Sequence, residues 1–111
     1  MTSRIAGIGI YVPETVVTNH DLAKIVDTND QWITERTGIR ERRISTGEGT
    51  RHLAAKAAAC ALENAGVKPE ELDLIILGTS TPDRNFPGDA CYVQAMLGAK
   101  NAAAFDISAA C

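Results

Sequence analysis

Several ingredients of common protein classes are scarce in this 111-residue chain. Its three cysteines are an odd number with no CxxC spacing and no His/Cys cluster, which argues against a disulfide framework and a zinc site. Its apolar stretches are far shorter than the roughly 20 residues that span a bilayer, and no signal peptide is recognisable. A net charge of -3 gives no general attraction to nucleic acids or anionic membranes. We therefore expect a soluble, cytoplasmic protein that binds no metal, no nucleic acid and no membrane.

Aromatic residues make up only 5% of the chain, whereas hydrophobic residues make up 45% and alanine is abundant, so we expect a core of closely packed small side chains. Short apolar runs predict strands at residues 4–12, 72–79 and 102–107, the first of them buried on both faces. Capping residues and glycine stops predict helices after Asn19, from Asn29 to Gly38, from Thr50 as N-cap to Gly66, and over 88–97, with 40–46 irregular. The segment from 72 to 107 has the length of one crossover unit in a parallel sheet, so the class is α/β.

Three parallel strands would leave open sheet faces and unpaired edges that natural proteins seldom expose. No linker, repeat or low-complexity segment divides residues 1–111. We therefore expect these residues to form part of one larger domain.

Cys111 follows the predicted strand 102–107 after a few small residues. If a helix followed, the thiol would lie at its N-terminus, where the helix dipole lowers a thiol pKa and favours a nucleophile. The alternative is an inert cysteine at the end of a buried strand. Cys60 and Cys91 lie in predicted helices among small apolar residues, and we expect both to be inert.

The segment 29–43 holds a concentration of positive charge in an acidic chain. Trp32 and Arg36 are four residues apart and therefore share one face of the predicted helix. Four of the seven arginines lie within eight residues: Arg36, Arg40, Arg42 and Arg43. An indole beside guanidinium groups suits a ligand with a flat ring and phosphates, such as a carrier that contains a nucleotide. The alternative is a solvated charge run with a surface cation–π pair.

The loop 80–87 is rich in turn formers and follows a predicted strand. Ligands of open parallel sheets bind at the carboxyl ends of the strands, so this loop and Cys111 could face one cavity. Alternatively, Phe86 before Pro87 serves only as a local anchor of the loop.

Three stretches of the chain, 27–43, 78–98 and 105–111, resemble the N-terminal part of the β-ketoacyl-acyl-carrier-protein synthase III family. They read DTNDQWITERTGIRERR, GTSTPDRNFPGDACYVQAMLG and FDISAAC. The resemblance implies a thiolase-like fold of two βαβαβ halves, of which residues 1–111 would be most of the first. It also implies an acyltransferase that condenses a short acyl-coenzyme A, such as acetyl-coenzyme A, with malonyl-acyl-carrier protein. The family's catalytic His and Asn belong to the second half, so activity would require that half.

The resemblance also implies roles for particular residues. Cys111 matches the nucleophile that takes the acyl group, and Trp32 matches the residue that stacks on adenine. Arg36, Thr37 and Thr28 match positions that contact the nucleotide and pantetheine parts of coenzyme A. Acyl-coenzyme A is then a substrate, and no cofactor is implied.

Phe86 matches a residue that reaches across a homodimer to bound the acyl pocket, and Arg40 matches basic surface near the tunnel mouth. Two alternatives remain open on the sequence: a condensing enzyme that primes polyketide synthesis, and a non-catalytic segment that binds coenzyme A or mediates dimerisation.

Overall fold

The structure, a computed structural model, describes residues 2–109. Its contacts divide the chain into two compact units. The larger unit comprises the described residues 2–11 and 48–109, and the smaller unit is Val12–Gly47. No helix within the described residues is long and apolar enough to cross a membrane.

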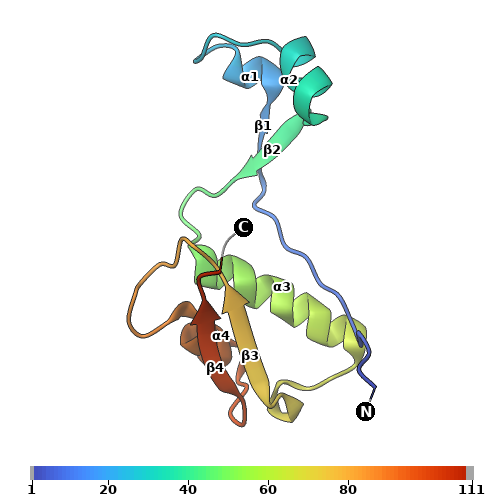
Figure 1. Cartoon of the computed structure of the whole chain (residues 1–111), viewed down its shortest axis with the longest axis vertical. Helices are drawn as coiled ribbons and strands as arrows, with labels where there is room; N and C mark the ends of the chain where they lie inside the picture. Colours follow the sequence, from blue (N-terminus) through green and yellow to red (C-terminus); the bar gives the residue numbers. More distant parts are fainter. Residues whose placement is uncertain (1, 110–111) are drawn as a thin grey trace. The chain divides into compact units, whose positions relative to one another are not determined.

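The larger unit is built on a parallel pair of strands (Figure 1). Its elements are α3 (Thr50–Ala65), the 3-10 turn η1 (Pro69–Glu71), β3 (Leu74–Gly78), α4 (Asp89–Leu97) and β4 (Ala103–Ile107). Strands β3 and β4 pair in parallel, with Leu74 opposite Ala103, and α4 connects them and packs on both. Helix α3 packs on α4. The predicted crossover unit is therefore confirmed, although its strands are shorter than predicted.

Side chains of β3 and β4 alternate between a covered and an open face of the sheet. The open face carries apolar side chains that are 40–52% exposed: Leu74, Ile76, Phe105 and Ile107. The core on the covered side is mostly alanine, as expected from the composition: Ala55, Ala90, Val93, Ala99 and Ala102. Small side chains let the helices and the strands approach closely.

The strand predicted at 4–12 is wrong for the described residues, in which this segment is extended but unpaired. Gly7 and Gly9 pass so close to α3 that a Cβ atom on either would collide with the helix. The Ile8 N–H donates to the Asn64 side chain at 3.2 Å instead of to a neighbouring strand. The prediction of burial on both faces is also wrong, because Ile5 and Ile10 are exposed.

The smaller unit combines an antiparallel strand pair with two short helices. Its elements are β1 (Thr15–Thr18), α1 (Asn19–Leu22), α2 (Asp30–Thr37) and β2 (Glu41–Ile44). The prediction that 40–46 is irregular is wrong, because β2 pairs with β1. Helix α1 is capped by Thr18 rather than Asn19, since Thr18 forms a capping box with Asp21 and leaves Asn19 buried.

Candidate functional site

Helix α2 displays an aromatic ring and a cation together on the smaller unit. The Asn29 side chain caps the helix by accepting from the Trp32 N–H at 2.8 Å, and Gly38 ends it with a φ of 72°. The Arg36 guanidinium carbon lies 5.0 Å from the centre of the Trp32 ring, in cation–π range. Because Trp32 is 53% exposed, the ring can also stack on an external ligand. The predicted helix and the predicted shared face are both confirmed.

The other predicted site residues of this unit differ in how available their polar groups are. The Thr37 hydroxyl donates to the Ile33 carbonyl at 2.7 Å and accepts from the Ile39 N–H at 3.0 Å. The Thr28 hydroxyl oxygen is buried and has no hydrogen-bond partner within the described residues. Arg40 is exposed. Of the two threonine hydroxyls, Thr28 and Thr37, only that of Thr28 lacks a hydrogen-bond partner among the described residues.

Two of the four clustered arginines hold the smaller unit together. Arg42 donates to the side chain of Asn19 at 2.8 Å, and Arg43 donates to the Pro13 carbonyl at 3.1 Å. The positive charge that the sequence concentrates in 29–43 is thus divided in use. Arg42 and Arg43 form hydrogen bonds within the unit, whereas Arg36 and Arg40 are exposed.

Asn19 is the buried centre of this unit. Its Nδ2 donates to Asp30 at 2.8 Å and to the Ile39 carbonyl at 2.7 Å, while its Oδ1 accepts the bond from Arg42. The bond from Asn19 holds the pKa of Asp30 below its usual value, because it stabilises the carboxylate form. Asn19 joins the start of α1 to α2 and β2, and so supports the helix that carries Trp32.

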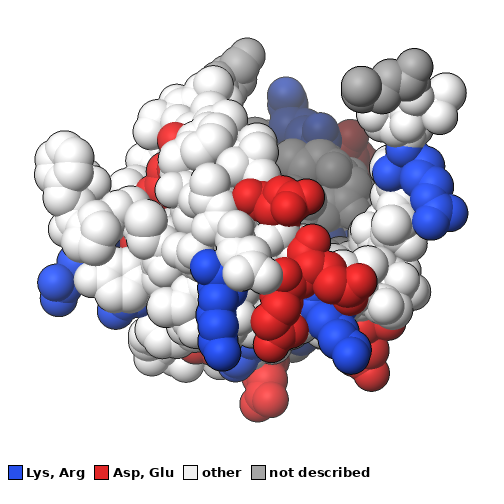
Figure 2. Space-filling model, turned by 90° about the horizontal axis from the view of Figure 1, so that it is seen from below, with Lys and Arg blue, Asp and Glu red and all other residues white. Residues whose placement is uncertain are grey.

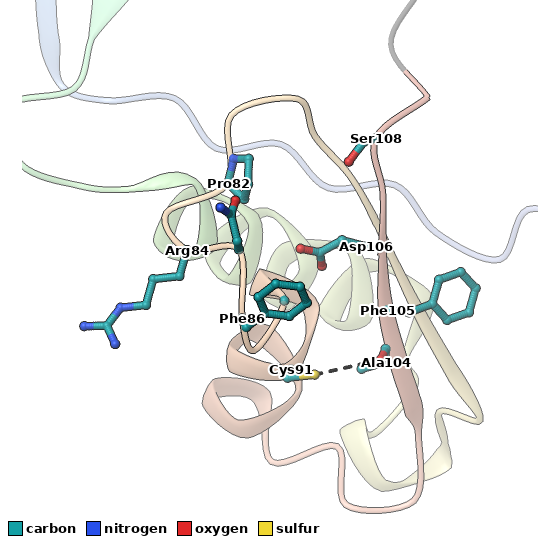
Figure 3. A pocket seen from close by; sticks show the side chains of 10 residues that line it. Pro82, Arg84, Phe86, Cys91, Ala104, Phe105, Asp106 and Ser108 are labelled. Atoms are coloured by element: carbon teal, nitrogen blue, oxygen red, sulfur yellow. Dashed lines mark hydrogen bonds between the residues drawn. The ribbon is translucent and has the colours of Figure 1, made fainter.

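In the larger unit, a hollow of about 610 Å³ lies between the β3–α4 loop and β4 (Figure 3). The loop, α4 and β4 contribute its lining: Pro82, Arg84, Asn85, Phe86, Gly88, Cys91, Ala104, Phe105, Asp106 and Ser108. Phe86 is 90% exposed and precedes Pro87 through a cis peptide bond. The loop lines this hollow together with β4, but the prediction that the loop and Cys111 face one cavity is not tested, because Cys111 lies outside the described residues.

The N-cap residue, just before the first helical residue, is a glycine in both α-helices of the larger unit: Gly49 for α3 and Gly88 for α4. A glycine has no side chain to cap the helix. The carboxylate of Asp83 accepts from the Thr50 N–H at 2.8 Å and so caps α3 from the loop, which makes the prediction of Thr50 as N-cap wrong. The carboxylate of Asp106 accepts from the N–H groups of residues 89 and 90 at 2.8 and 2.7 Å and so caps α4 from β4. Helix amides of this kind favour negative charge.

Asp89 connects these two caps. Its side chain is completely buried, and its Oδ2 accepts from the Asp83 N–H at 2.7 Å. Its Oδ1 is buried with no hydrogen-bond partner among the described residues. We call Asp83, Asp89 and Asp106 the carboxylate series, because each of the three accepts a backbone N–H at the loop or at a helix start.

The two cysteines that the structure describes differ in exposure. Cys60 is exposed on α3, whereas Cys91 is partly buried beside the hollow, with its sulfur 3.9 Å from the Ala104 carbonyl oxygen. Among the described residues, no group of three or more His, Cys, Asp or Glu side chains is placed to hold a metal ion. On the face of the molecule drawn in Figure 2, acidic and basic side chains are interspersed beside a broad uncharged area.

Comparison with known proteins gives close matches along nearly the whole chain. β-Ketoacyl-[acyl-carrier-protein] synthase III of Clostridium acetobutylicum is 60% identical over 107 residues, which are 96% of this chain and 33% of that protein. The crystal structure of 3-oxoacyl-[acyl-carrier-protein] synthase III from Aquifex aeolicus VF5 matches with a TM-score of 0.93 and 59% identity, over 97% of this chain and 35% of that one. The priming β-ketosynthase of the R1128 polyketide pathway matches with a TM-score of 0.92 and 40% identity, over 97% and 33%.

The chain spans about a third of the length of the curated relatives that it matches. No family model matches it. The solved structures confirm the α/β class and the thiolase-like fold that the resemblance implied.

Proposed function

Since this chain is the counterpart of the N-terminal part of β-ketoacyl-[acyl-carrier-protein] synthase III, we propose that it belongs to an acyltransferase that condenses a short acyl-coenzyme A with malonyl-acyl-carrier protein. The Cys111 thiolate attacks the carbonyl carbon of a short acyl-coenzyme A, the bond to the coenzyme A sulfur breaks, and the acyl group remains as a cysteine thioester. Malonyl-acyl-carrier protein then loses carbon dioxide, and the resulting carbanion attacks that thioester. Cys111 is released and a 3-oxoacyl-acyl-carrier protein forms. The observation that carries this proposal is the 60% identity over nearly the whole chain.

The smaller unit supports the coenzyme A part of the proposal. Adenine stacks on the exposed Trp32 ring, and Arg36 supplies positive charge for the phosphates. Thr28 contributes a hydroxyl that has no partner within the unit. Because the Thr37 hydroxyl is engaged with the backbone, Thr37 contacts the ligand through its methyl group or backbone.

The partners follow from the same proposal. The active protein is a cytoplasmic homodimer, in which Phe86 bounds the acyl pocket of the neighbouring subunit. The 90% exposure of Phe86 supports this role, because a large apolar ring gains most when a partner covers it. Exposed Arg40 contributes positive charge near the pocket entrance, where the carrier protein approaches. Acyl-coenzyme A acts as a substrate, and the protein requires no cofactor.

A second candidate is the priming step of polyketide synthesis, favoured by the match to the R1128 priming β-ketosynthase. Both candidates share the acylated cysteine and differ in the carrier protein that supplies the malonyl group. Turnover with the carrier protein of fatty-acid synthesis, compared with one from a polyketide pathway, separates them.

The test uses the full-length protein that contains this segment. Incubation with acetyl-coenzyme A followed by peptide mass mapping should place one acetyl group on Cys111, and the Cys111→Ala variant should take up none. Addition of malonyl-acyl-carrier protein should then remove the acetyl group and release carbon dioxide. Acylation of Cys60 or Cys91 instead of Cys111 would contradict the proposal.

A further inference from the structure

The β3–α4 loop, residues 79–88, is bonded to the rest of the larger unit at its start, its middle and its end. At its start, the Thr79 N–H donates to the Ile107 carbonyl at 3.0 Å, and the Thr81 carbonyl accepts from the Thr50 hydroxyl at 2.7 Å. In its middle, the Asp83 N–H donates to Asp89 at 2.7 Å, while the Asp83 carboxylate holds the start of α3 through Thr50. At its end, the first N–H groups of α4 donate to Asp106 on β4. The carboxylate series therefore connects the loop to α3, α4 and β4.

Only residues 84–87 lie between Asp83, which is bonded to Asp89, and the capped start of α4. Phe86 is among them, and with 90% of its surface exposed its ring is not held by packing against the described residues. The position of the ring is therefore set by the backbone of the loop, which in turn is held by the carboxylate series. In Figure 3 the Phe86 ring lies over the hollow whose other wall is β4.

Asp89 is the central member of the series, because its N–H donates to Asp106 and its carboxylate accepts from Asp83. A completely buried carboxyl group with an unpartnered oxygen is costly in solvation free energy. Stability alone is therefore a poor explanation for an aspartate here, since a small apolar residue would avoid that cost. What the carboxylate adds is a directional bond that selects one loop geometry.

We propose that Asp89 is a positioning residue that fixes the placement of Phe86 through Asp83, and so determines which acyl chain lengths the pocket accepts. The proposal rests on the proposed function, because the acyl group is the ligand bounded by Phe86. If Oδ2 of Asp89 is lost, the middle of the loop is released from α4 and is held only through α3, so Phe86 no longer takes one fixed place in the acyl pocket of the neighbouring subunit. Longer acyl groups then enter a pocket that normally discriminates against them.

The experiment compares Asp89→Ala and Asp89→Asn in the full-length protein, with Asp73→Asn as control because Asp73 is exposed and lies outside the series. The measured quantity is the ratio of kcat/KM for acetyl-coenzyme A to that for hexanoyl-coenzyme A. We expect Asp89→Ala to change this ratio by roughly tenfold, the scale on which one methylene group counts in an apolar pocket. Asp89→Asn should retain the normal ratio, because its side-chain oxygen still accepts the Asp83 N–H.

Other results would overturn the inference. Equal loss of kcat/KM for both substrates, or a lower melting temperature with an unchanged ratio, would make Asp89 a residue of the core alone. If Asp89→Ala does not fold, Asp89→Ser provides the test, because its hydroxyl is too short to reach Asp83 and the same ratio change is expected. A serine variant that also fails to fold would assign Asp89 to stability and reject the proposal. Failure of the proposed function is recognised separately, because the unmodified protein would then not acylate Cys111.

Discussion

A methyl group on Gly88 would lie 3.0 Å from the carboxyl carbon of Asp106. The absence of a side chain at Gly88, the N-cap residue of α4, is therefore what lets β4 supply the cap of this helix. Asp106 has little freedom to retreat, because its two oxygens already accept two backbone N–H groups.

Gly88→Ala should destabilise the full-length protein by about 1–3 kcal/mol, because the added methyl group displaces the Asp106 carboxylate from the helix amides. Chemical denaturation measures the free energy of unfolding. Gly78→Ala is the matched control, since nothing lies within 4 Å of its added Cβ atom. Equal effects of the two variants would show that the contact at Gly88 has no special importance.

Asn19→Ala should loosen the smaller unit, because it leaves Asp30, Ile39 and Arg42 without their bonds to the Asn19 side chain. Each buried group left unpaired costs about 1–3 kcal/mol. Hydrogen exchange should become faster for amides between residues 12 and 47, with amides of α4 unchanged. The control Asn101→Ala removes an exposed amide side chain and should change neither region.

The smaller unit should also lose protection in acid. The bond from Asn19 holds the pKa of Asp30 below its usual value of 3.8, so the folded state keeps the carboxylate charged at lower pH than the unfolded chain does. The contribution of Asp30 to stability is therefore fully present above that value and is lost as pH falls through the folded-state pKa. Hydrogen exchange in 12–47, corrected for intrinsic rates, should show this loss below pH 3.8. Asp30→Asn should show a smaller change with pH, and exposed Asp27→Asn should behave like the unmodified protein.

Trp32→Ala should weaken binding of acyl-coenzyme A by about 1–3 kcal/mol, the range for loss of aromatic stacking on a base. Isothermal titration of the full-length protein gives the affinity. Gln31→Ala, on the same helix, is the control and should change affinity little, because it removes only an exposed contact to Glu35. If the two variants bind equally well, Trp32 is an ordinary surface residue.

Arg36→Ala should make binding of acyl-coenzyme A less sensitive to salt if, as proposed, this charge interacts with the phosphates. Titrations at low and high ionic strength measure this slope. Arg43→Ala is a useful comparison, since Arg43 is bonded to the Pro13 carbonyl and its loss should leave the slope nearly unchanged. An unchanged slope in Arg36→Ala would argue that the phosphates bind elsewhere.

The elements that the sequence predicts well are those whose signals are local. Helix α2 lies between Asn29 and Gly38 as predicted, because a capping side chain and a left-handed glycine mark its ends. The site pair Trp32 and Arg36 was predictable for the same reason, since positions four apart on a helix share a face.

The failures concern partners that lie far away along the chain. An apolar run such as 4–12 has strand character, but a strand also needs a neighbour, and Gly7 and Gly9 pack against α3 instead. Strand β2 was missed because its four residues, ERRI, show no alternation of apolar and polar side chains. They form a strand because they pair with β1. Such pairings depend on the folded chain and not on local composition.

Two members of the carboxylate series were also missed. Asp89 and Asp106 have no motif of their own, and only Asp83 belongs to a loop that attracts notice in the sequence. A signal was nevertheless present: both α3 and α4 begin at a glycine where a capping Ser, Thr, Asp or Asn is usual. A glycine at that position suggests that another part of the chain supplies the cap.

The parallel pairing of β3 and β4 has a consequence for the order in which the protein folds. Leu74 and Ala103 meet across a single connecting helix, whereas the bond between Ile8 and Asn64 joins residues 56 positions apart. Closing the shorter connection costs less chain entropy, so β3, α4 and β4 should assemble while the first residues are still unstructured. Pulsed hydrogen exchange during refolding would then protect the amide of Thr79, which donates to Ile107, before that of Ile8. The segment around Ile8 would then become ordered after the parallel strand pair that it does not join.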